Sequence, residues 1–314
     1  MEYIKLKNSD LSVSRLCMGG CPMGGYDWGS DIVEDELIAA VHCAIELGIN
    51  FFDTADTYGL GQSERTLGKA LKGRRDKVIV GSKFGVHAKK GTPTFYDNSP
   101  EWIRKSIDGT LSRLGTDYLD IYYVHYRDGK TPLAEVVDAL EDLKNQGKIR
   151  YYGLSNIHQS DLPELEAYKG RFVAFQDEYS LATRKNEKDI LGLSSKLCMT
   201  PMTWGSLGQG ILTGKYSLSN VDFKAGDRRS RDIYVNFHGE KLLKNLKIVD
   251  ELKLLAQKYD KPVSAVAIRF ILDYLPESAV LCGVKRPAQI LANAEGCDWK
   301  LSPEDIELLK EVSA

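Results

Sequence analysis

Eight short apolar segments recur along the chain, and amphipathic segments of helix length separate them. Each of the eight is rich in β-branched, aromatic or other apolar residues, which is typical of a buried strand. Strands that alternate with helices predict an α/β fold with a parallel sheet, and eight strands suffice to close that sheet into a (β/α)8 TIM barrel. The predicted strands are LCMG (16–19), NFFD (50–53), VIVGS (78–82), YLDIYYV (118–124), RYYGL (150–154), FVAFQ (172–176), LCMTPMT (197–203) and AVLCG (279–283).

Two of the intervening segments carry clear helix start and stop signals. Ser99-Pro100 supplies an N-cap and a first helical residue, and Gly115 supplies an end. Thr131-Pro132 is expected to open the next helix in the same way, with Gly147 closing it. The apolar stripes that would face the sheet are Ile103, Ile107, Leu111 and Leu114 in the first helix, and Leu133, Val136, Val137, Leu140 and Leu143 in the second.

Two segments depart from the alternation. Residues 1–15 contain two short strand-like runs around Asn8-Ser9-Asp10, which predicts a hairpin that plugs the floor of the barrel. Residues 205–238 lack periodicity and exceed a normal strand-to-helix connection, so we expect a functional loop whose part at 234–237 touches substrate. No fixed repeat or low-complexity linker is found, which predicts a single domain over residues 1–314.

Charge and composition disfavour several classes of partner. The 42 basic and 44 acidic residues are spread evenly and give a net charge of −2, so neither nucleic acid nor an anionic membrane surface is expected to bind. The N-terminal residues resemble neither a signal nor a transit peptide, which predicts a cytoplasmic protein, with a monomer as the default. Six cysteines without a C-x-x-C pair are interpreted as buried, reduced thiols.

Polar residues follow the predicted strands, at the barrel end where active sites lie in this architecture. In chain order these residues are Asp53, Lys83, His125, Ser155 and Asn156, Gln176 at the end of its strand, Trp204, and Gly283 with Lys285 and Arg286.

This set suits a site that protonates a carbonyl oxygen while a nicotinamide cofactor brings the hydride. A phenol is a weak acid at neutral pH, but the Lys83 ammonium would lower the pKa of Tyr58, and Asp53 would hold that ammonium in place. His125 would polarise the carbonyl as a hydrogen-bond donor. Amide-recognising groups for the nicotinamide carboxamide are available at Ser155, Asn156 and Gln176, and Trp204 offers a flat face for the ring.

Taken singly, these residues have structural explanations. Asp53 and Asp56 could serve as caps or Asx turns, and Lys83 could be a solvated loop lysine. His125 could be a satisfied buried polar group, Trp204 a core residue, and Ser155 and Asn156 caps of the following helix. Their joint placement at successive strand ends favours a reductase site instead.

Seven runs over nearly the whole chain resemble, in order, motifs of the aldo-keto reductase family. They are DTADTYG (53–59), GSKFG (81–85), YVHYRD (123–128), GKIRYYGLSN (147–156), QDEYS (176–180), GSLGQGILTGKY (205–216) and GVKRPAQILAN (283–293). The resemblance implies NADPH-dependent reduction of an aldehyde or ketone by a catalytic tetrad of Asp53, Tyr58, Lys83 and His125.

The resemblance also implies a cofactor site. It places Ser155, Asn156 and Gln176 on the carboxamide, Trp204 against the nicotinamide, and Ser206, Leu207 and Gly210 along the pyrophosphate. Lys285 and Arg286 would face the adenosine 2′-phosphate, and two cations favour binding of this extra phosphate. Gln289 and Asn293 would contact the adenine, and Gly20, Gly205 and Gly283 complete the set of cofactor-binding candidates. Gly20-Cys21-Pro22 stands where many relatives carry a Gly-Thr-Trp-like segment, and Asp177 is less usual than a neutral residue.

Other functions remain compatible with these residues. The same barrel occurs in NADPH-binding regulatory β-subunits of potassium channels, and a keto-sugar reductase of a biosynthetic pathway would use the same tetrad. A metal-dependent hydrolase is disfavoured because the strand ends carry no His-x-His and too few carboxylates, so no metal is expected. His125 disfavours a steroid double-bond reductase, where a glutamate takes that position.

Loops are expected to choose the small carbonyl substrate, namely those at 24–30, 86–98, 126–130 and 228–237. Their aromatic residues, with Trp28 and Tyr126 foremost, predict a pocket that accepts apolar or aromatic groups.

Overall fold

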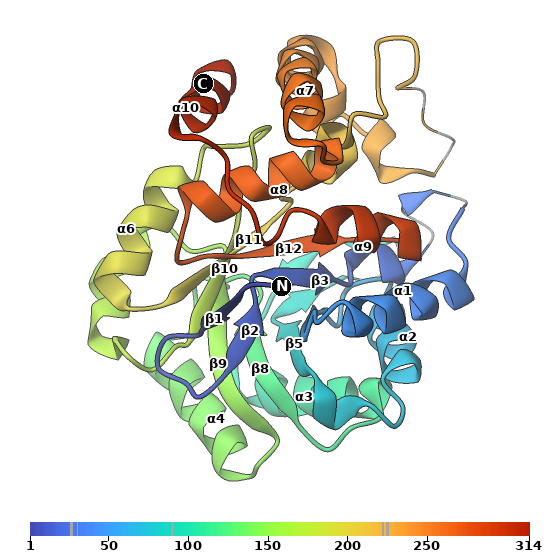
Figure 1. Cartoon of the computed structure of the whole chain (residues 1–314). Helices are drawn as coiled ribbons and strands as arrows, with labels where there is room; N and C mark the ends of the chain where they lie inside the picture. The colour runs from blue at the N-terminus through green and yellow to red at the C-terminus, as the bar shows by residue number, and fades with distance from the viewer. Residues whose placement is uncertain (26–27, 30, 89–90, 222, 224–225) are drawn as a thin grey trace.

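The computed structural model describes residues 1–25, 28–29, 31–88, 91–221, 223 and 226–314. Eight parallel strands form a closed barrel in the order β10-β11-β12-β3-β4-β5-β8-β9, and helices surround it (Figure 1). The predicted (β/α)8 barrel is confirmed. Its strands are β3 (Leu16–Gly19), β4 (Phe51–Asp53), β5 (Ile79–Phe84), β8 (Leu119–Val124), β9 (Ile149–Ser155), β10 (Ala174–Glu178), β11 (Thr200–Trp204) and β12 (Ala279–Gly283).

All eight predicted strands occur, and the boundaries of β3 and β12 match the prediction residue for residue. The predicted start of the seventh strand at residue 197 is wrong, because Leu197 is the last residue of helix α6 (Glu187–Leu197). Cys198 then takes a left-handed conformation with φ of 56°, which turns the chain before β11 begins at Thr200. Strand β5 runs on to Phe84, so Lys83 lies within the strand and not after it.

The N-terminal hairpin closes one end of the barrel, as predicted. Strand β1 (Tyr3–Lys5) pairs antiparallel with β2 (Ser12–Ser14). Leu6, Leu11 and Val13 are buried in one cluster with side chains of the barrel strands, including Phe51 and Ile121. The hairpin therefore fills the end of the barrel opposite the strand ends that carry the polar residues.

Helix α3 (Pro100–Leu114) has the predicted caps: the Ser99 side chain accepts a hydrogen bond from the Trp102 backbone N–H, and Gly115 is left-handed. Helix α4 (Leu133–Asn145) begins one position later than expected, with Pro132 as its N-cap and no side-chain cap. The prediction for Thr131 is wrong, because its hydroxyl instead donates to Asp128 at 2.7 Å.

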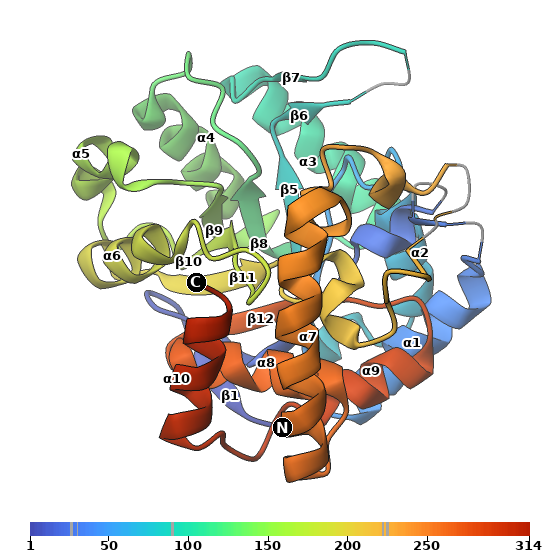
Figure 2. The ribbon, with the colours of Figure 1, turned by 90° about the horizontal axis from the view of Figure 1, so that it is seen from above.

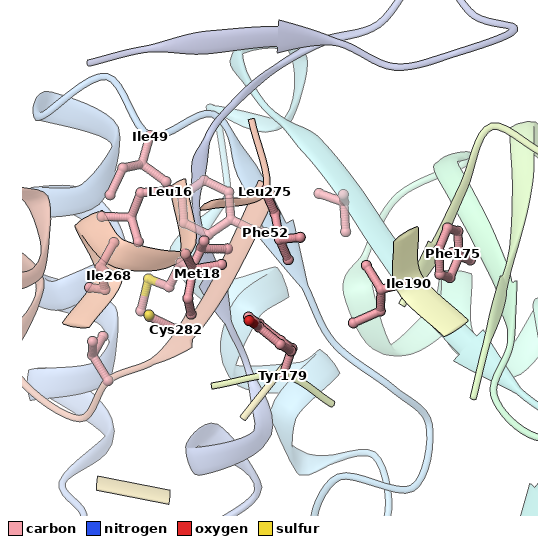
Figure 3. Close-up of a cluster of buried hydrophobic side chains, with 14 of the residues drawn as sticks. Leu16, Met18, Ile49, Phe52, Phe175, Tyr179, Ile190, Ile268, Leu275 and Cys282 are labelled. Carbon is pink, nitrogen blue, oxygen red and sulfur yellow. The ribbon is translucent and has the colours of Figure 1, made fainter. Parts of the chain in front are cut away.

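Apolar side chains of the helices and the outer barrel wall form a second cluster, in which Met18 and Cys282 lie beside Ile268 of α8 (Figure 3). Cys17, Cys282 and Cys297 are buried as expected, whereas Cys21, Cys43 and Cys198 are partly exposed. The remaining longer helices are α1 (Glu34–Glu46), α2 (Gln62–Ala70), α7 (Gly239–Tyr259), α8 (Val263–Tyr274), α9 (Pro287–Ala294) and α10 (Pro303–Val312), with a short α5 (Leu162–Leu165).

In the described part of the expected functional loop at 205–238 the chain forms the 3-10 turns η6 (Gly208–Thr213), η7 (Arg228–Ser230) and η8 (Val235–Phe237). Figure 2 shows α7 directly after this loop, crossing the face of the molecule beside α10. Parts of the predicted substrate loops, at 26–27, 30 and 89–90, lie outside the described residues.

Candidate active site

A cavity of about 1230 Å³ opens at the carboxyl ends of the barrel strands. Its wall includes all four predicted catalytic residues, at the ends of β4, β5 and β8 and in the loop after β4. The structure also brings most of the predicted cofactor residues to the same cavity: Ser155, Asn156, Gln176, Trp204, Gly205, Ser206, Leu207, Gly210, Gly283, Lys285, Arg286, Gln289 and Asn293.

Lys83 is the centre of the hydrogen bonds at the cavity floor. Its Nζ donates to Asp53 Oδ2 at 2.5 Å, to the Thr54 carbonyl oxygen at 3.0 Å and to the Tyr58 hydroxyl at 3.2 Å. These acceptors match the three donors of an ammonium. Lys83 is 2% exposed, so it is not the solvated loop lysine that the residue type alone suggests.

The parallel pairing of β4 with β5 holds the Lys83 and Asp53 side chains together, because Asp53 pairs with Gly81, two residues before Lys83. Side chains two apart on a strand share a face, so neighbouring strands deliver both groups to one point. The loop that carries Tyr58 is held by Gly59, which has φ of 59°. A Cβ there would lie 2.0 Å from the Gly24 carbonyl oxygen, so the close contact requires glycine.

The acidity of Tyr58 differs from the prediction. Loss of hydration raises the pKa of the Tyr58 phenol well above its usual value, and the negative charge of Asp53 acts in the same direction. This direction is opposite to the expected lowering, and its main cause is the burial of the phenol. The phenol is therefore protonated at neutral pH and carries a proton that it can donate.

His125 follows β8, and its ring meets the Tyr58 ring edge to face at a centroid distance of 5.9 Å. Desolvation, reinforced by the charge of Lys83, holds the pKa of His125 well below its usual value. The imidazole is therefore neutral at physiological pH. Its Nδ1 is buried and has no hydrogen-bond partner among the described residues, so it is not a satisfied core histidine.

The three amide-recognising candidates form one network around the floor. Asn156 Nδ2 donates to the His125 carbonyl oxygen at 2.9 Å and to Ser155 Oγ at 3.0 Å. Neither residue caps the next helical turn, which begins after His158. Gln176 Nε2 donates to Asp53 Oδ1 at 2.6 Å, a contact that strand-end placement alone did not predict. Gln176 Oε1 is buried with no partner among the described residues.

One predicted cofactor residue is not brought to the cavity wall. Gly20 lies behind it, where its N–H donates to the Asp53 carbonyl oxygen at 2.6 Å and its own carbonyl oxygen accepts from Ser63 Oγ at 2.7 Å. Both backbone groups are therefore engaged within the protein. The neighbouring Cys21 and Pro22 line the cavity instead.

The two predicted substrate-pocket residues both line the cavity. The Tyr126 ring stacks on the His125 ring at 5.2 Å, and the Arg228 guanidinium lies 5.0 Å above the Trp28 ring. Arg228 was not predicted, because nothing in its local sequence separates it from Arg229 and Arg231. Its position over Trp28 depends on a contact between the loop after β3 and η7.

At the far end of the cavity the predicted phosphate-binding cations contact carboxylates that the sequence interpretation did not include. Lys285 Nζ donates to Asp31 Oδ1 at 3.0 Å, and Arg286 donates to Asp31 and Glu36. Gln289 Oε1 accepts a hydrogen bond from the Lys285 backbone N–H at 2.6 Å. Only the fold reveals these partners, because they lie far away in sequence.

A (β/α)8 barrel whose strand ends bring a phenol, an ammonium, a carboxylate and an imidazole to one cavity defines a class, the barrel oxidoreductases. The profile of the Aldo/keto reductase family matches residues 15–314, and this chain belongs to that family of NAD(P)H-linked oxidoreductases.

Similar proteins cover the whole chain. The NADH-specific methylglyoxal reductase of Escherichia coli (strain K12) is 32% identical, covering 100% of this chain and 98% of its own. The structure of a glycerol dehydrogenase from Gluconobacter oxydans has a TM-score of 0.87 at 32% identity, covering 99% of this chain and 94% of its own. An aldo-keto reductase from Klebsiella pneumoniae in complex with NADPH has a TM-score of 0.76 at 25% identity, covering 100% and 96%. No helix among the described residues is long and apolar enough to cross a membrane.

Proposed function

We propose that this protein reduces an aldehyde or ketone to the alcohol, reversibly, with NADPH as the preferred cofactor. The observation that carries the proposal is the contact of Lys83 Nζ with both Asp53 at 2.5 Å and Tyr58 at 3.2 Å, in a cavity that all the other predicted site residues except Gly20 line.

The cavity residues fit a nicotinamide cofactor. Gln176 Oε1 is a buried acceptor without a partner among the described residues, and a carboxamide N–H would satisfy it. Ser155 and Asn156 offer further polar atoms beside it, and Trp204 offers an aromatic face. When bound, the cofactor supplies the hydride that no side chain of the protein can provide.

Tyr58 acts as the general acid. As the carbonyl carbon is reduced, negative charge develops on its oxygen, and the protonated Tyr58 hydroxyl transfers its proton there to complete the alcohol. The phenolate left behind is stabilised by Lys83, whose Nζ already donates to the Tyr58 oxygen. Asp53 and Gln176 hold Lys83 in this position by the hydrogen bonds on the two oxygens of the Asp53 carboxylate.

His125 orients and polarises the carbonyl. A neutral imidazole donates one hydrogen bond without bringing a mobile acidic proton to the site, which suits a donor to the developing oxyanion. The low pKa of His125 keeps it in that form, and the ring contacts with Tyr58 and Tyr126 fix its plane.

The choice of NADPH is supported by Lys285 and Arg286, two cations at the far end of the cavity. Among the similar proteins, the Klebsiella pneumoniae structure holds NADPH, whereas the Escherichia coli reductase is described as NADH-specific.

The substrate proposed from Trp28 and Tyr126 is a small carbonyl compound with an apolar or aromatic group. We infer further that residues 1–314 act as one domain, as a monomer, in the cytoplasm.

The test is Tyr58→Phe, which removes the acid and keeps the ring. We expect kcat/KM for nitrobenzaldehyde with NADPH to fall by roughly 10²–10⁴, the usual contribution of a general acid. Binding of NADPH, followed by its fluorescence, should persist. Tyr118→Phe is the matched control, because Tyr118 lies before β8 at the other end of the barrel.

Turnover in Tyr58→Phe close to that of the unaltered protein would contradict the proposed acid. Tight NADPH binding by the unaltered protein without turnover of any compound in a broad carbonyl panel would favour the regulatory alternative.

A further inference from the structure

The cations that are proposed to meet the cofactor's 2′-phosphate already hold carboxylates. Asp31 lies between them: its Oδ1 accepts from Lys285 Nζ at 3.0 Å, and its Oδ2 accepts from Arg286 Nη2 at 3.1 Å. Arg286 Nη2 also donates to the Asp31 carbonyl oxygen at 3.2 Å, and Arg286 Nε donates to Glu36 Oε2 at 2.7 Å. Two carboxylates thus neutralise the two cations.

The fold places these groups together. Asp31 comes just before α1 and Glu36 lies in the first turn of α1, while Arg286 is the N-cap of α9. Helices α1 and α9 lie side by side on the barrel (Figure 1). Lys285 Nζ also donates to the Trp28 carbonyl oxygen, so the segment that leads into α1 is held against the start of α9.

Asp31 lines the same cavity as Lys285 and Arg286, so its carboxylate is a group that a bound adenosine ribose would meet. The charge of the 2′ substituent decides the outcome of that meeting. A phosphate ester carries nearly two negative charges. To bind Lys285 and Arg286 it must first displace the Asp31 carboxylate from them. A ribose 2′-hydroxyl is neutral and can donate to a carboxylate, as it does in many NAD sites.

The carboxylate of Asp31 can exchange partners with water. The Asp31 side chain is 50% exposed, while its partners Arg286 and Lys285 are 41% and 13% exposed, and ion pairs in contact with water contribute little net stability. A 2′-phosphate can therefore replace Asp31. The free energy of binding is smaller than it would be if the two cations had no carboxylate partners, because the Asp31 contacts are lost. Asp31 and Glu36 thus oppose the preference for NADPH that Lys285 and Arg286 create.

We propose that Asp31, assisted by Glu36, is a specificity-determining residue that competes with the 2′-phosphate for Lys285 and Arg286 and so keeps NADH an effective cofactor beside NADPH. This inference rests on the function proposed above and assigns to that site the residues that set its cofactor choice.

Titration calorimetry with two nucleotides tests the competition without turnover. The probes are 2′,5′-ADP, which carries the 2′-phosphate, and ADP, which lacks it. Asp31→Asn should bind 2′,5′-ADP about tenfold more tightly than the unaltered protein, a gain of about 1.4 kcal/mol, while its affinity for ADP stays the same or falls. Glu36→Gln should bind 2′,5′-ADP about threefold more tightly. The effect is smaller because Glu36 contacts only one of the two cations, Arg286.

Asp35→Asn is the matched control. It removes the same charge from the first turn of α1, four residues after Asp31, and Asp35 is exposed. An equal gain in Asp35→Asn would assign the effect to general charge and overturn the role of Asp31. The ratio of kcat/KM for NADPH to that for NADH should rise in Asp31→Asn and not in the control.

The two proposals fail differently. If Asp31→Asn binds both nucleotides as the unaltered protein does, while Lys285→Ala weakens 2′,5′-ADP, then the competition is wrong and the NADPH site stands. If neither the unaltered protein nor Asp31→Asn binds 2′,5′-ADP more tightly than ADP, then the NADPH preference is wrong and the competition falls with it.

Discussion

The two ends of the cavity use the same chemical groups in opposite environments. At the catalytic floor the side chains of Lys83 and Asp53 are 2% and 5% exposed. At the other end, where the adenosine is proposed to bind, the side chains of Asp31, Arg286 and Lys285 are 50%, 41% and 13% exposed. A buried pair is costly to break because one charge is left without water or partner, whereas an exposed pair exchanges freely with solvent. The floor therefore keeps one geometry, whereas the carboxylate at the proposed adenosine end is free to change partners.

The supporting elements differ in the same sense. Asp53 and Lys83 belong to adjacent strands of the barrel wall, and Gln176 of β10 fixes the second carboxylate oxygen of Asp53. Asp31 lies outside regular secondary structure, ahead of α1. Rigid positioning suits proton transfer, and adaptable contacts suit recognition of two related cofactors.

The largest effect is expected from Lys83→Met, which leaves Asp53 as a buried carboxylate without its cation. The free energy of unfolding, from urea denaturation, should fall by about 3–5 kcal/mol. Turnover should fall by roughly 10²–10⁴ as for loss of the acid, since Tyr58 loses the ammonium that stabilises its phenolate.

The double variant Asp53→Asn with Lys83→Met separates the two effects. It removes both charges, so most of the stability should return while activity remains lost. Recovery of activity in the double variant would show that the single variant fails through folding alone.

A second prediction concerns Asp56, a carboxyl three residues after Asp53 for which the described residues provide no ion pair. Its Oδ1 is buried without a partner among the described residues, and burial raises the pKa of Asp56 to about 7, with the charge of Glu64 acting in the same direction. Because the folded-state pKa is above the unfolded value, this carboxyl stabilises the fold at low pH, and that stability is lost as the pH rises from about 4 to about 7.

Asp56→Asn should remove this dependence. At pH 8 the variant should be more stable than the unaltered protein by about 1–3 kcal/mol, and at pH 4 the two should agree closely. Thermal unfolding across this pH range measures the difference. Parallel pH profiles for the two proteins would contradict the raised pKa.

The smallest effect on stability is expected from Lys285→Ala. Loss of its contact with the half-exposed Asp31 should change the free energy of unfolding by no more than about 1 kcal/mol. The same urea measurement used for Lys83→Met checks this. A cost equal to that of Lys83→Met would erase the proposed difference between the two ends.

Local sequence was sufficient for much of the fold. Strand composition, helix caps and the Asn8-Ser9-Asp10 turn depend on neighbouring residues, so the eight strands and the hairpin could be predicted and were found. The residues at strand ends converge because a closed parallel barrel brings them to one mouth. Thr131 shows the limit of local signals: it was predicted to cap α4, but its hydroxyl donates to Asp128 instead.

The site was only partly predictable for the same reason. Tyr58, Lys83 and Asp53 could be placed together from strand order, but the direction of the pKa shift of Tyr58 depends on its loss of hydration and on the net charge around it. Gly20 was expected at the cofactor, yet its backbone bonds to Asp53 and Ser63 place it behind the wall.

The sequence by itself thus specifies a barrel, a hairpin that closes one end of it, and a set of candidate proton-transfer residues, because each follows from short-range patterns and a closed topology. The carboxylates that contact Lys285 and Arg286, the proposed phosphate-binding cations, do not follow from any such pattern. Asp31 and Lys285 are separated by 254 positions. They meet only because closure of the barrel packs α1 against α9. Burial and long-range pairing, which set the strength of every charge in this cavity, are properties of the assembled fold.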